Sequence, residues 1–355
     1  MKRIITILNA IFIVQNLAIQ IAVVHSYSLD STSHTLMLQG LHQVHIEQYM
    51  GAIGTFENLV KLNPQHPIGY FCTAAVYKTI MQNYRIKSFE SQLDSILNLT
   101  IEIGNKAIQN DREDALAYFY LGGAYGFRGL HKVRKRDWWG AFNDGLKGLS
   151  NLKKAVRIDS SLYDAYYGLG TFHYWRSAKS KILRFLLFRK DQQKGIDEIW
   201  TAIYKGRYTD IEGKYALVAI YYDHGDYEKA FSLNQQLYEL FPTNPSCLYM
   251  RSKLYEQQEK WGEAKQIFQQ LLKHLLNSEY RSIGYEVECL YGIAYCHYKS
   301  SELEQALKHV KKALDLRNER DVSNEIEGPL EDFNEIEKKA MNLYGTLINE
   351  IVGKE

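Results

Sequence analysis

The sequence predicts an all-α fold in which antiparallel helix pairs stack into a solenoid. Two observations support this prediction: one helical pattern recurs along most of the chain, and an aromatic residue occupies the same place in six successive copies. Self-similarity at a fixed period is typical of solenoids, where each unit leaves a hydrophobic face that only its neighbour covers. We call these six residues the aromatic ladder: Phe71, Phe119, Tyr167, Tyr215, Tyr249 and Tyr291.

Residues 1–28 are expected to be a cleaved signal peptide, so that the chain is exported to the periplasm or secreted. Lys2 and Arg3 precede an apolar stretch from Ile4 to Val24, and small residues follow it at 26–28. The alternative is an uncleaved membrane anchor. It is disfavoured because four amides would then enter hydrocarbon, those of Asn9, Gln15, Asn16 and Gln20.

Residues 29–47 are predicted to form a lead-in helix, and residues 48–317 the repeat array of about six helix pairs. Tyr221, Ala230 and Leu237 recur 34 residues later as Tyr255, Ala264 and Leu271. This spacing, with Leu121-Gly122 and Leu169-Gly170 on first helices, resembles the tetratricopeptide repeat. The resemblance implies a right-handed solenoid whose first helices line the inner, concave face.

Earlier units are longer than the 34-residue repeat. Ala74, Gly122, Gly170 and Val218 occupy equivalent positions but lie 48 residues apart. The 14 extra residues equal about four helical turns, which predicts longer helices in phase with the rest. Such widened units are similar to those of bacterial envelope repeat proteins without known activity, in the runs Gly126–Leu130, Trp138-Trp139, Asp164–Gly170 and Tyr174-Trp175.

The chain is expected to end with a linker, residues 318–328, and a capping helix, residues 329–355. Gly328-Pro329 is predicted to open this helix because proline suits a first helical turn. Its polar outer face would cover the core of the last repeat. The predicted apolar stripe is Leu330, Phe333, Ile336, Leu343, Leu347 and Ile351.

The cysteines and overall composition indicate a protein held together by packing alone. Hydrophobic residues make up 46% of the 355 residues, enough for a sizeable core. Cys289 and Cys296 lie seven residues apart on one helix, which separates them by about 10 Å, beyond disulfide reach. With Cys72 and Cys247 in other repeats, all four are predicted to be free core thiols.

Positive charge is concentrated in residues 128–194, which hold 16 Lys/Arg against 5 Asp/Glu, and Trp138, Trp139, Trp175 and Trp200 accompany this stretch. One interpretation is solvated charges on long helices. The other is a surface for anionic lipid, since basic residues beside tryptophans suit a membrane interface. The candidate residues are Arg128, Lys132, Arg134, Lys135, Arg136, Trp138, Trp139, Lys179, Lys181, Arg184, Arg189 and Lys190.

The aromatic ladder also has two interpretations. Its rings either line an open groove that binds an extended peptide or partner protein, or pack between neighbouring units. Four acidic residues near the rim, Asp164, Glu212, Glu256 and Glu288, would then favour a basic guest or serve as helix N-terminal charges. The candidate groove residues are Phe71, Phe119, Tyr167, Tyr174, Tyr215, Tyr222, Tyr249 and Tyr291.

The sequence predicts no enzyme. It contains no nucleophile elbow, phosphate loop or paired metal motif, so no catalytic residue, cofactor or metal ligand is assigned. Export makes nucleic acid an improbable partner. We expect a protein-interaction scaffold of the bacterial cell envelope, with docking on anionic lipid as the alternative; the oligomeric state is left open.

Overall fold

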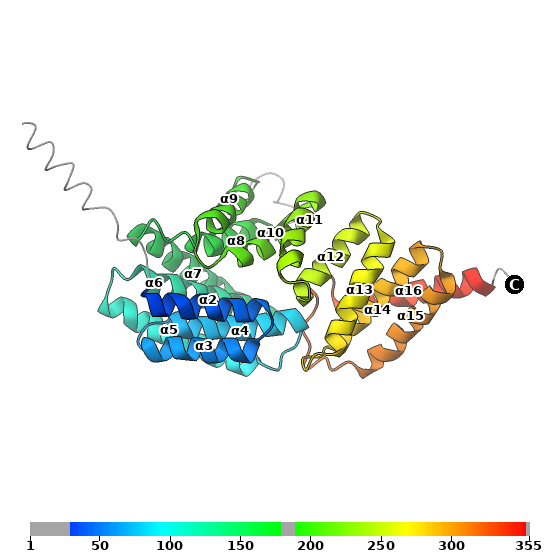
Figure 1. Cartoon of the computed structure of the whole chain (residues 1–355), viewed down its shortest axis with the longest axis horizontal. Helices are drawn as coiled ribbons and strands as arrows, with labels where there is room; N and C mark the ends of the chain where they lie inside the picture. The colour runs from blue at the N-terminus through cyan, green and yellow to red at the C-terminus, as the bar shows by residue number, and fades with distance from the viewer. Residues whose placement is uncertain (1–28, 179–188, 353–355) are drawn as a thin grey trace, which may run out of the picture.

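The computed structural model describes residues 29–178 and 189–352. In this part of the chain the regular secondary structure is helical, with one antiparallel β-bridge between Ile86 and Glu325 and no strand. Figure 1 shows the helices stacked side by side along one long axis. The predicted all-α solenoid is confirmed. The expected signal peptide lies outside the described residues.

The helices pack as consecutive pairs. The described residues form seven pairs rather than about six, because the expected lead-in helix packs on its successor as the first member of a pair. The pairs are α2 (Ser31–His45) with α3 (Tyr49–Leu62), α4 (Ile68–Tyr84) with α5 (Glu90–Asn110), α6 (Ala115–Arg134) with α7 (Trp138–Ile158), α8 (Ala165–Ala178) with α9 (Arg189–Lys205), α10 (Asp210–His224) with α11 (Tyr227–Leu240), α12 (Pro245–Gln257) with α13 (Trp261–Leu276), and α14 (Ile283–Lys299) with α15 (Leu303–Leu316).

Local sequence explains where several helices begin. The Asp114 carboxylate accepts the backbone N–H of Ala117 at 2.8 Å at the start of α6, and Asn244 caps α12 in the same way. Pro245 follows as the first residue of α12, where its missing N–H costs nothing. Each cap satisfies a backbone donor that has no partner inside its own helix.

The longer units contain longer helices. Helices α5, α6 and α7 have 21, 20 and 21 residues, whereas α11, α12 and α13 have 14, 13 and 16. Glycines let some of these helices touch through their backbones. A Cβ atom at Gly170 would lie 2.5 Å from the carbonyl oxygen of Gly195, and one at Gly195 would lie 2.7 Å from that of Gly170. Helices α8 and α9 therefore approach at a pair of glycines.

The C-terminal helix starts later than predicted. After η1 (Arg317–Glu319) an irregular segment continues to residue 332, and α16 spans Phe333–Val352. Pro329 lies in that segment, because Asp332 caps the helix through the N–H of Glu335 at 2.9 Å. Helix α16 then covers the last pair with a hydrophobic face of Ala340, Leu343 and Leu347. We call residues 320–332 the linker segment.

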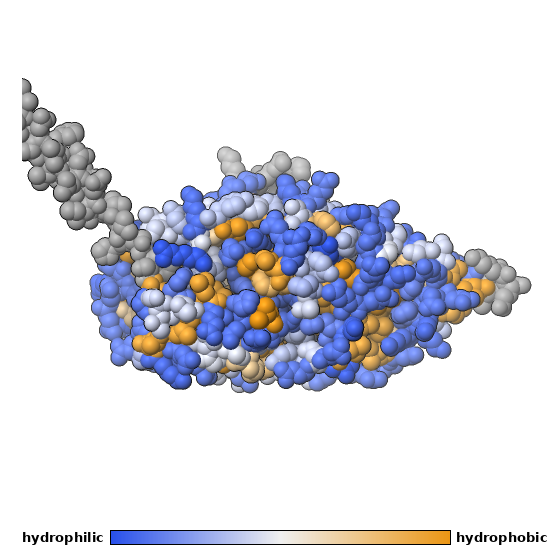
Figure 2. Space-filling model, in the orientation of Figure 1, coloured by the Kyte–Doolittle hydropathy of each residue, from blue (hydrophilic) through white to orange (hydrophobic). Residues whose placement is uncertain are grey.

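The core runs along the whole array, and its members include the four cysteines. All four are free and buried, as predicted. No helix within the described ranges has the length and hydrophobicity needed to cross a membrane. On the face shown in Figure 2, hydrophobic residues form small separate groups among hydrophilic ones.

Candidate functional site

The aromatic ladder occupies the first helix of each of six pairs, on α4, α6, α8, α10, α12 and α14. None of the six ring-bearing residues is fully exposed. Phe71 shows the pattern, because its ring stacks on Phe127 at a centroid distance of 4.9 Å and tilts against Tyr120 at 5.5 Å. The ladder thus contributes to packing between neighbouring units.

Two of the expected groove residues belong to the core. Tyr174 and Tyr249 are only 0% and 2% exposed. Their hydroxyls donate to carboxylates inside the array, Tyr174 to Asp223 at 2.9 Å and Tyr249 to Glu288 at 2.8 Å. The expectation that these two rings face an open groove is wrong. A partner role for the half-buried members stays a prediction: Phe71, Phe119, Tyr167, Tyr215, Tyr222 and Tyr291.

The N-terminal helices explain this burial, because they reach across to later repeats. In α2, His34 Nδ1 lies 2.6 Å from the Tyr208 hydroxyl, although 174 residues separate the two. At the next crossing point, Ser246 donates to the Asn83 side chain at 2.7 Å. Helix α4 also packs directly on α12. Between α2 or α4 and the later helices α10 and α12, the inner face is therefore covered by the chain itself.

Each of the four acidic residues expected at the rim has a partner within the chain, although Oε2 of Glu212 is buried without one. Glu256 pairs with Lys253 at 2.6 Å, and burial raises the pKa of the Glu256 carboxyl against the effect of that lysine. The other contacts are Glu212 with His45, Glu288 with Arg85, and Asp164 with the backbone N–H groups of Arg207 and Tyr208.

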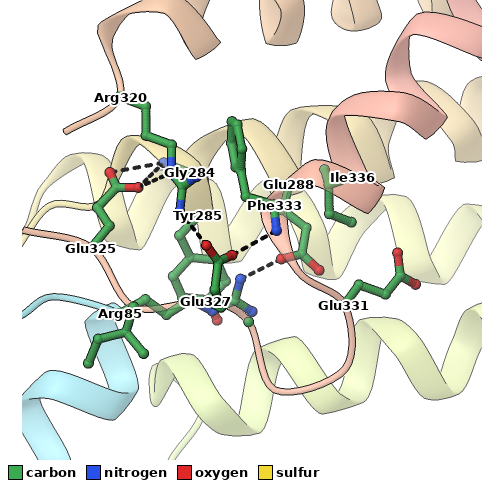
Figure 3. A pocket seen from close by; sticks show the side chains of 12 residues that line it. Arg85, Gly284, Tyr285, Glu288, Arg320, Glu325, Glu327, Glu331, Phe333 and Ile336 are labelled. Carbon is green, nitrogen blue, oxygen red and sulfur yellow. Dashed lines mark hydrogen bonds and ion pairs between the residues drawn. The ribbon is translucent and has the colours of Figure 1, made fainter. Parts of the chain in front are cut away.

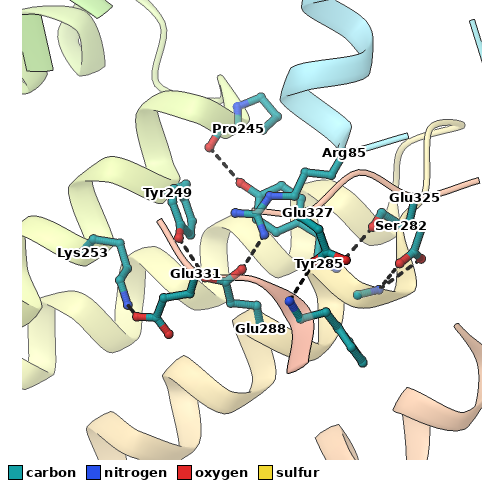
Figure 4. Close-up of polar contacts among 12 residues, drawn as sticks. Arg85, Pro245, Tyr249, Lys253, Ser282, Tyr285, Glu288, Glu325, Glu327 and Glu331 are labelled. Atoms are coloured by element: carbon teal, nitrogen blue, oxygen red, sulfur yellow. Dashed lines mark hydrogen bonds and ion pairs between the residues drawn. The ribbon is translucent and has the colours of Figure 1, made fainter. Parts of the chain in front are cut away.

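Arg85 is the centre of the most elaborate polar site (Figure 4). It follows α4 in a left-handed conformation, with φ 55° and ψ 43°, which costs energy for a residue with a side chain. Its buried guanidinium lies 3.6 Å from the ring centre of Tyr285 and 4.6 Å from that of Tyr249. It also donates to the Glu288 carboxylate. Helices α4, α12 and α14 thus meet at one charged group.

The charge of Arg85 is kept despite its burial. Desolvation opposes the charged form, but the adjacent Glu288 carboxylate outweighs it and raises the pKa of the guanidinium. Within the described residues, Nη2 of Arg85 is buried and has no hydrogen-bond partner. One donor of this group therefore remains available for an acceptor oxygen.

The linker segment closes over the Arg85 site (Figure 3). The N–H of Ile326 donates to the backbone carbonyl of Arg85 at 2.8 Å, and the N–H of Lys87 donates to the backbone carbonyl of Asn324 at 2.7 Å. These two bonds make the antiparallel bridge between chain segments more than 230 residues apart. The linker segment is thus bound as a short extended strand.

Side chains reinforce this pairing. The buried Glu325 carboxylate accepts the N–H of Gly284, at the start of α14, at 3.1 and 3.2 Å, and the Nε–H of Arg320 at 2.7 Å. Glu331 lies 3.9 Å from Lys253. A cavity of about 10 Å³ remains between Arg85 and the linker segment, room for roughly one water molecule.

A separate open hollow of about 500 Å³ lies between α3, α4 and α5. Val60, Tyr70, Tyr77, Ile96 and Leu99 supply most of its apolar lining. It shares no lining residue with the cavity at the Arg85 site. The ladder does not contribute to it.

The basic stretch is partly neutralised inside the array. Asp144, buried in α7, accepts from Arg128 at 2.8 Å through both carboxylate oxygens and from Lys132 at 2.8 Å. Lys135 pairs with Asp94 at 2.7 Å. These three basic residues are therefore committed to internal pairs. The predicted candidates Lys179, Lys181 and Arg184, and the side chains of Arg189 and Lys190, lie outside the described residues.

The start of α7 nevertheless exposes a group of large apolar residues. Trp138 and Trp139 are 62% and 77% exposed, and Phe142 and Leu146 continue the group along the helix. Arg134 and Arg136 lie exposed in the residues just before it. The structure thus places aromatic and basic side chains together on one corner of the array.

Sequence reasoning missed the Arg85 site. Arg85 stands in a turn without a motif, and the residues that surround it come from α12, α14 and the linker segment. The sequence indicates Glu288 only as a rim charge. The acidic run at 325–331 is a local signal, but the predicted boundaries divide it between a linker that ends at residue 328 and a helix that begins at residue 329.

Comparisons with known proteins agree with this architecture. The sequence profile of the tetratricopeptide repeat family matches residues 221–283, from the end of α10 to the start of α14. The crystal structure of the APC/C hetero-tetramer Cut9-Hcn1 matches with a TM-score of 0.53 at 13% identity, over 82% of this chain and 48% of that one. The chain thus spans about half the length of that protein.

Two further structures have lower TM-scores. YrrB, described as a TPR protein with an unusual peptide-binding site, matches at 0.43 and 18% identity, over 61% of this chain and 94% of that one. A tetratricopeptide repeat protein from Parabacteroides merdae ATCC 43184 matches with a TM-score of 0.39 at 12% identity, over 88% of this chain and 99% of that one. No curated protein matches the sequence. The profile identifies tetratricopeptide repeats in residues 221–283, and the likeness to Cut9-Hcn1 shows the fold of the described chain, an α-solenoid of stacked helix pairs.

Proposed function

We propose that this chain is a non-catalytic protein-interaction scaffold, exported to the bacterial cell envelope, that holds an extended peptide or a partner protein against the inner face of its array. Solenoids present long surfaces rather than a single deep site, which suits binding of extended partners. Export rests on the basic and apolar residues 2–24.

One observation carries the proposal: an extended segment already lies against this face. Residues 324–326 pair through their backbone with residues 85–87, and their side chains meet groups from α12 and α14. Main-chain pairing gives affinity for an extended chain, while the surrounding side chains give specificity. The same surface is therefore suited to a partner's segment.

Site-specific photo-crosslinking in the native host tests the scaffold proposal. A photoreactive residue replaces Tyr291, a half-buried ladder residue on α14, and in a matched variant Tyr204, which is 76% exposed on α9 outside the ladder. We expect a discrete adduct with a protein partner from position 291 only. Adducts that form equally from both positions, or from 204 alone, would contradict binding at the inner face.

A second candidate function is docking on an anionic membrane. The specific observation is the exposed group of Trp138, Trp139 and Phe142 beside Arg134 and Arg136. Aromatic rings insert at the lipid interface, and each nearby basic residue adds about 1 kcal/mol of attraction to an anionic surface.

Vesicle binding tests this second function. Reversing Arg134 and Arg136 to Glu should weaken binding to phosphatidylglycerol vesicles by at least roughly 25-fold at low salt, since each lost residue accounts for about 1 kcal/mol. Substituting the exposed Tyr204 by Ser is the matched control and should change nothing. If wild-type protein does not bind phosphatidylglycerol vesicles at low salt, membrane docking is excluded as a function.

A further inference from the structure

The linker segment carries a net negative charge. Residues 320–332 contain five acidic residues and one basic residue, a net charge of −4. Two of its carboxylates meet donor groups of the array: Glu325 accepts the N–H of Gly284 at the start of α14, and Glu331 lies 3.9 Å from Lys253, which also pairs with Glu256. A helix N-terminus attracts carboxylates through its unpaired N–H groups.

Arg85 supplies an independent sign that this surface is built for an acidic strand. The residue is more than nine-tenths buried, held in a strained backbone conformation, and still has one donor nitrogen without a partner in the described part of the chain. Buried polar groups are usually hydrogen-bonded, so such a donor points to an acceptor that the linker segment does not provide. A carboxylate or carbonyl oxygen matches it.

The linker segment is held by hydrogen bonds at one edge and is open to solvent at the other. Besides the two main-chain bonds to residues 85–87, Lys87 donates to the Val322 carbonyl at 3.1 Å and Ser88 to the Asn324 side chain at 3.0 Å. Val322 is 61% exposed, and the half-exposed Glu327 side chain accepts from Arg320 and from the N–H of Phe333. Because none of the bonds to residues 85–88 belongs to a helix, the segment can detach there without unfolding the helices beneath it.

We propose that the linker segment is a built-in occupant of a binding site for extended acidic peptides, and that an acidic segment of a partner protein replaces it by pairing with residues 85–87. This inference rests on the proposed scaffold function. It adds that the bound segment of the partner is acidic and that the linker segment competes with it. The incoming strand donates and accepts the same two backbone hydrogen bonds. Its carboxylates meet Gly284, Lys253 and the spare donor of Arg85.

The structure offers a substitution that releases the linker segment and leaves the acceptor intact. Ile326→Pro removes the N–H that reaches the Arg85 carbonyl. Val322→Pro is the matched control, because Val322 is the second residue of a turn closed by Asn324 N–H and Asp321 carbonyl, a position that proline favours.

The probe is a fluorescent peptide with the sequence of residues 320–332, added to the full chain. A linker segment bound in about 90 to 99% of molecules would weaken a competitor by roughly 10- to 100-fold. We therefore expect Ile326→Pro to bind the peptide at least roughly tenfold more tightly than wild type, and Val322→Pro to match wild type. A peptide with Gln at the positions of Glu325 and Glu327 should bind at least roughly tenfold more weakly.

Amide exchange shows whether release has occurred. The Lys87 N–H is bonded to the linker segment, so its exchange rate should rise in Ile326→Pro and stay at the wild-type value in Val322→Pro. Faster exchange without tighter peptide binding would overturn the proposal, as would unchanged exchange at Lys87. A wild-type dimer that Ile326→Pro abolishes would assign the site to a second copy of the chain and overturn it too.

These outcomes separate the inference from the scaffold function. Crosslinks from position 291 in the native host, combined with a peptide that fails to bind Ile326→Pro, would leave the scaffold standing and remove only the acidic-peptide site. Tight binding of the peptide to Ile326→Pro without crosslinks from position 291 would support the acidic-peptide site and remove the proposed envelope partner.

Discussion

Removing the carboxylate of Glu288 should destabilise the fold more than any surface change. Glu288 is buried in α14, where it pairs with Arg85 and accepts the Tyr249 hydroxyl at 2.8 Å. Glu288→Ala leaves the Arg85 guanidinium buried between two tyrosine rings without a counter-charge. It also leaves the Tyr249 hydroxyl without its acceptor.

The magnitude follows from the two losses. Breaking a buried ion pair by removing one partner costs about 3–5 kcal/mol, because the remaining charge is uncompensated. The stranded hydroxyl adds about 1–3 kcal/mol. The rings of Tyr249 and Tyr285 face Arg85 with or without Glu288, so their cation–π attraction cancels in the difference. We therefore expect a loss of roughly 4–8 kcal/mol.

Urea unfolding followed by circular dichroism measures this loss as a change in the free energy of unfolding. Glu337→Ala is the matched control, since Glu337 pairs with Arg317 at 2.8 Å at a partly exposed site. That pair should contribute about 0–1 kcal/mol. The double substitution of Arg85 and Glu288 by hydrophobic residues should restore much of the stability, because no unpaired charge remains.

Equal losses for Glu288→Ala and Glu337→Ala would refute this account of the Arg85 site. Such a result would mean that Arg85 is hydrated and that α4 does not pack against α12 and α14 as described.

Three further predictions test other parts of the array. Asp144→Asn should lower the free energy of unfolding by about 2–4 kcal/mol at pH 7. Burial raises the pKa of the Asp144 carboxyl, but hydrogen bonds from Arg128 and Lys132 outweigh burial and lower it. The difference between the two proteins in urea unfolding should therefore shrink below about pH 4, where the wild-type carboxyl becomes protonated. Gly170→Ala should lower stability by about 1–3 kcal/mol through contact with α9, whereas Gly262→Ala, with open space around it, should raise the melting temperature. A thiol reagent at pH 8 should not react with the native protein and should react with four thiols in urea, since burial raises the pKa of the cysteines, for Cys247 and Cys296 to about 12.

The helix pairs could be predicted from sequence because each repeat carries its own periodic pattern. The 34-residue phase places Ala230 and Ala264 correctly in the core, and the small residues at Gly170 and Gly195 allow α8 and α9 to touch. These positions depend on contacts between neighbours in sequence, which the period of the pattern records.

The contents of the inner face could not be predicted in this way. Tyr249 packs against Arg85, 164 residues earlier, and the carbonyl of Arg85 is bonded to the N–H of Ile326, 241 residues later. No periodic pattern connects such residues. Helix α7 shows the same limit, because Phe142 is exposed while Asp144 is buried with basic partners from α6.

Nitration of tyrosine, read out residue by residue by mass spectrometry, tests most directly whether the inner face is filled by the chain itself. Tyr249 is 2% exposed in the ladder, and burial raises the pKa of its hydroxyl, so it should not react. Tyr204 is 76% exposed on α9 and should be nitrated readily in the same sample. Nitration of Tyr249 at the rate of Tyr204 in folded protein would contradict the account and show that the inner face is open.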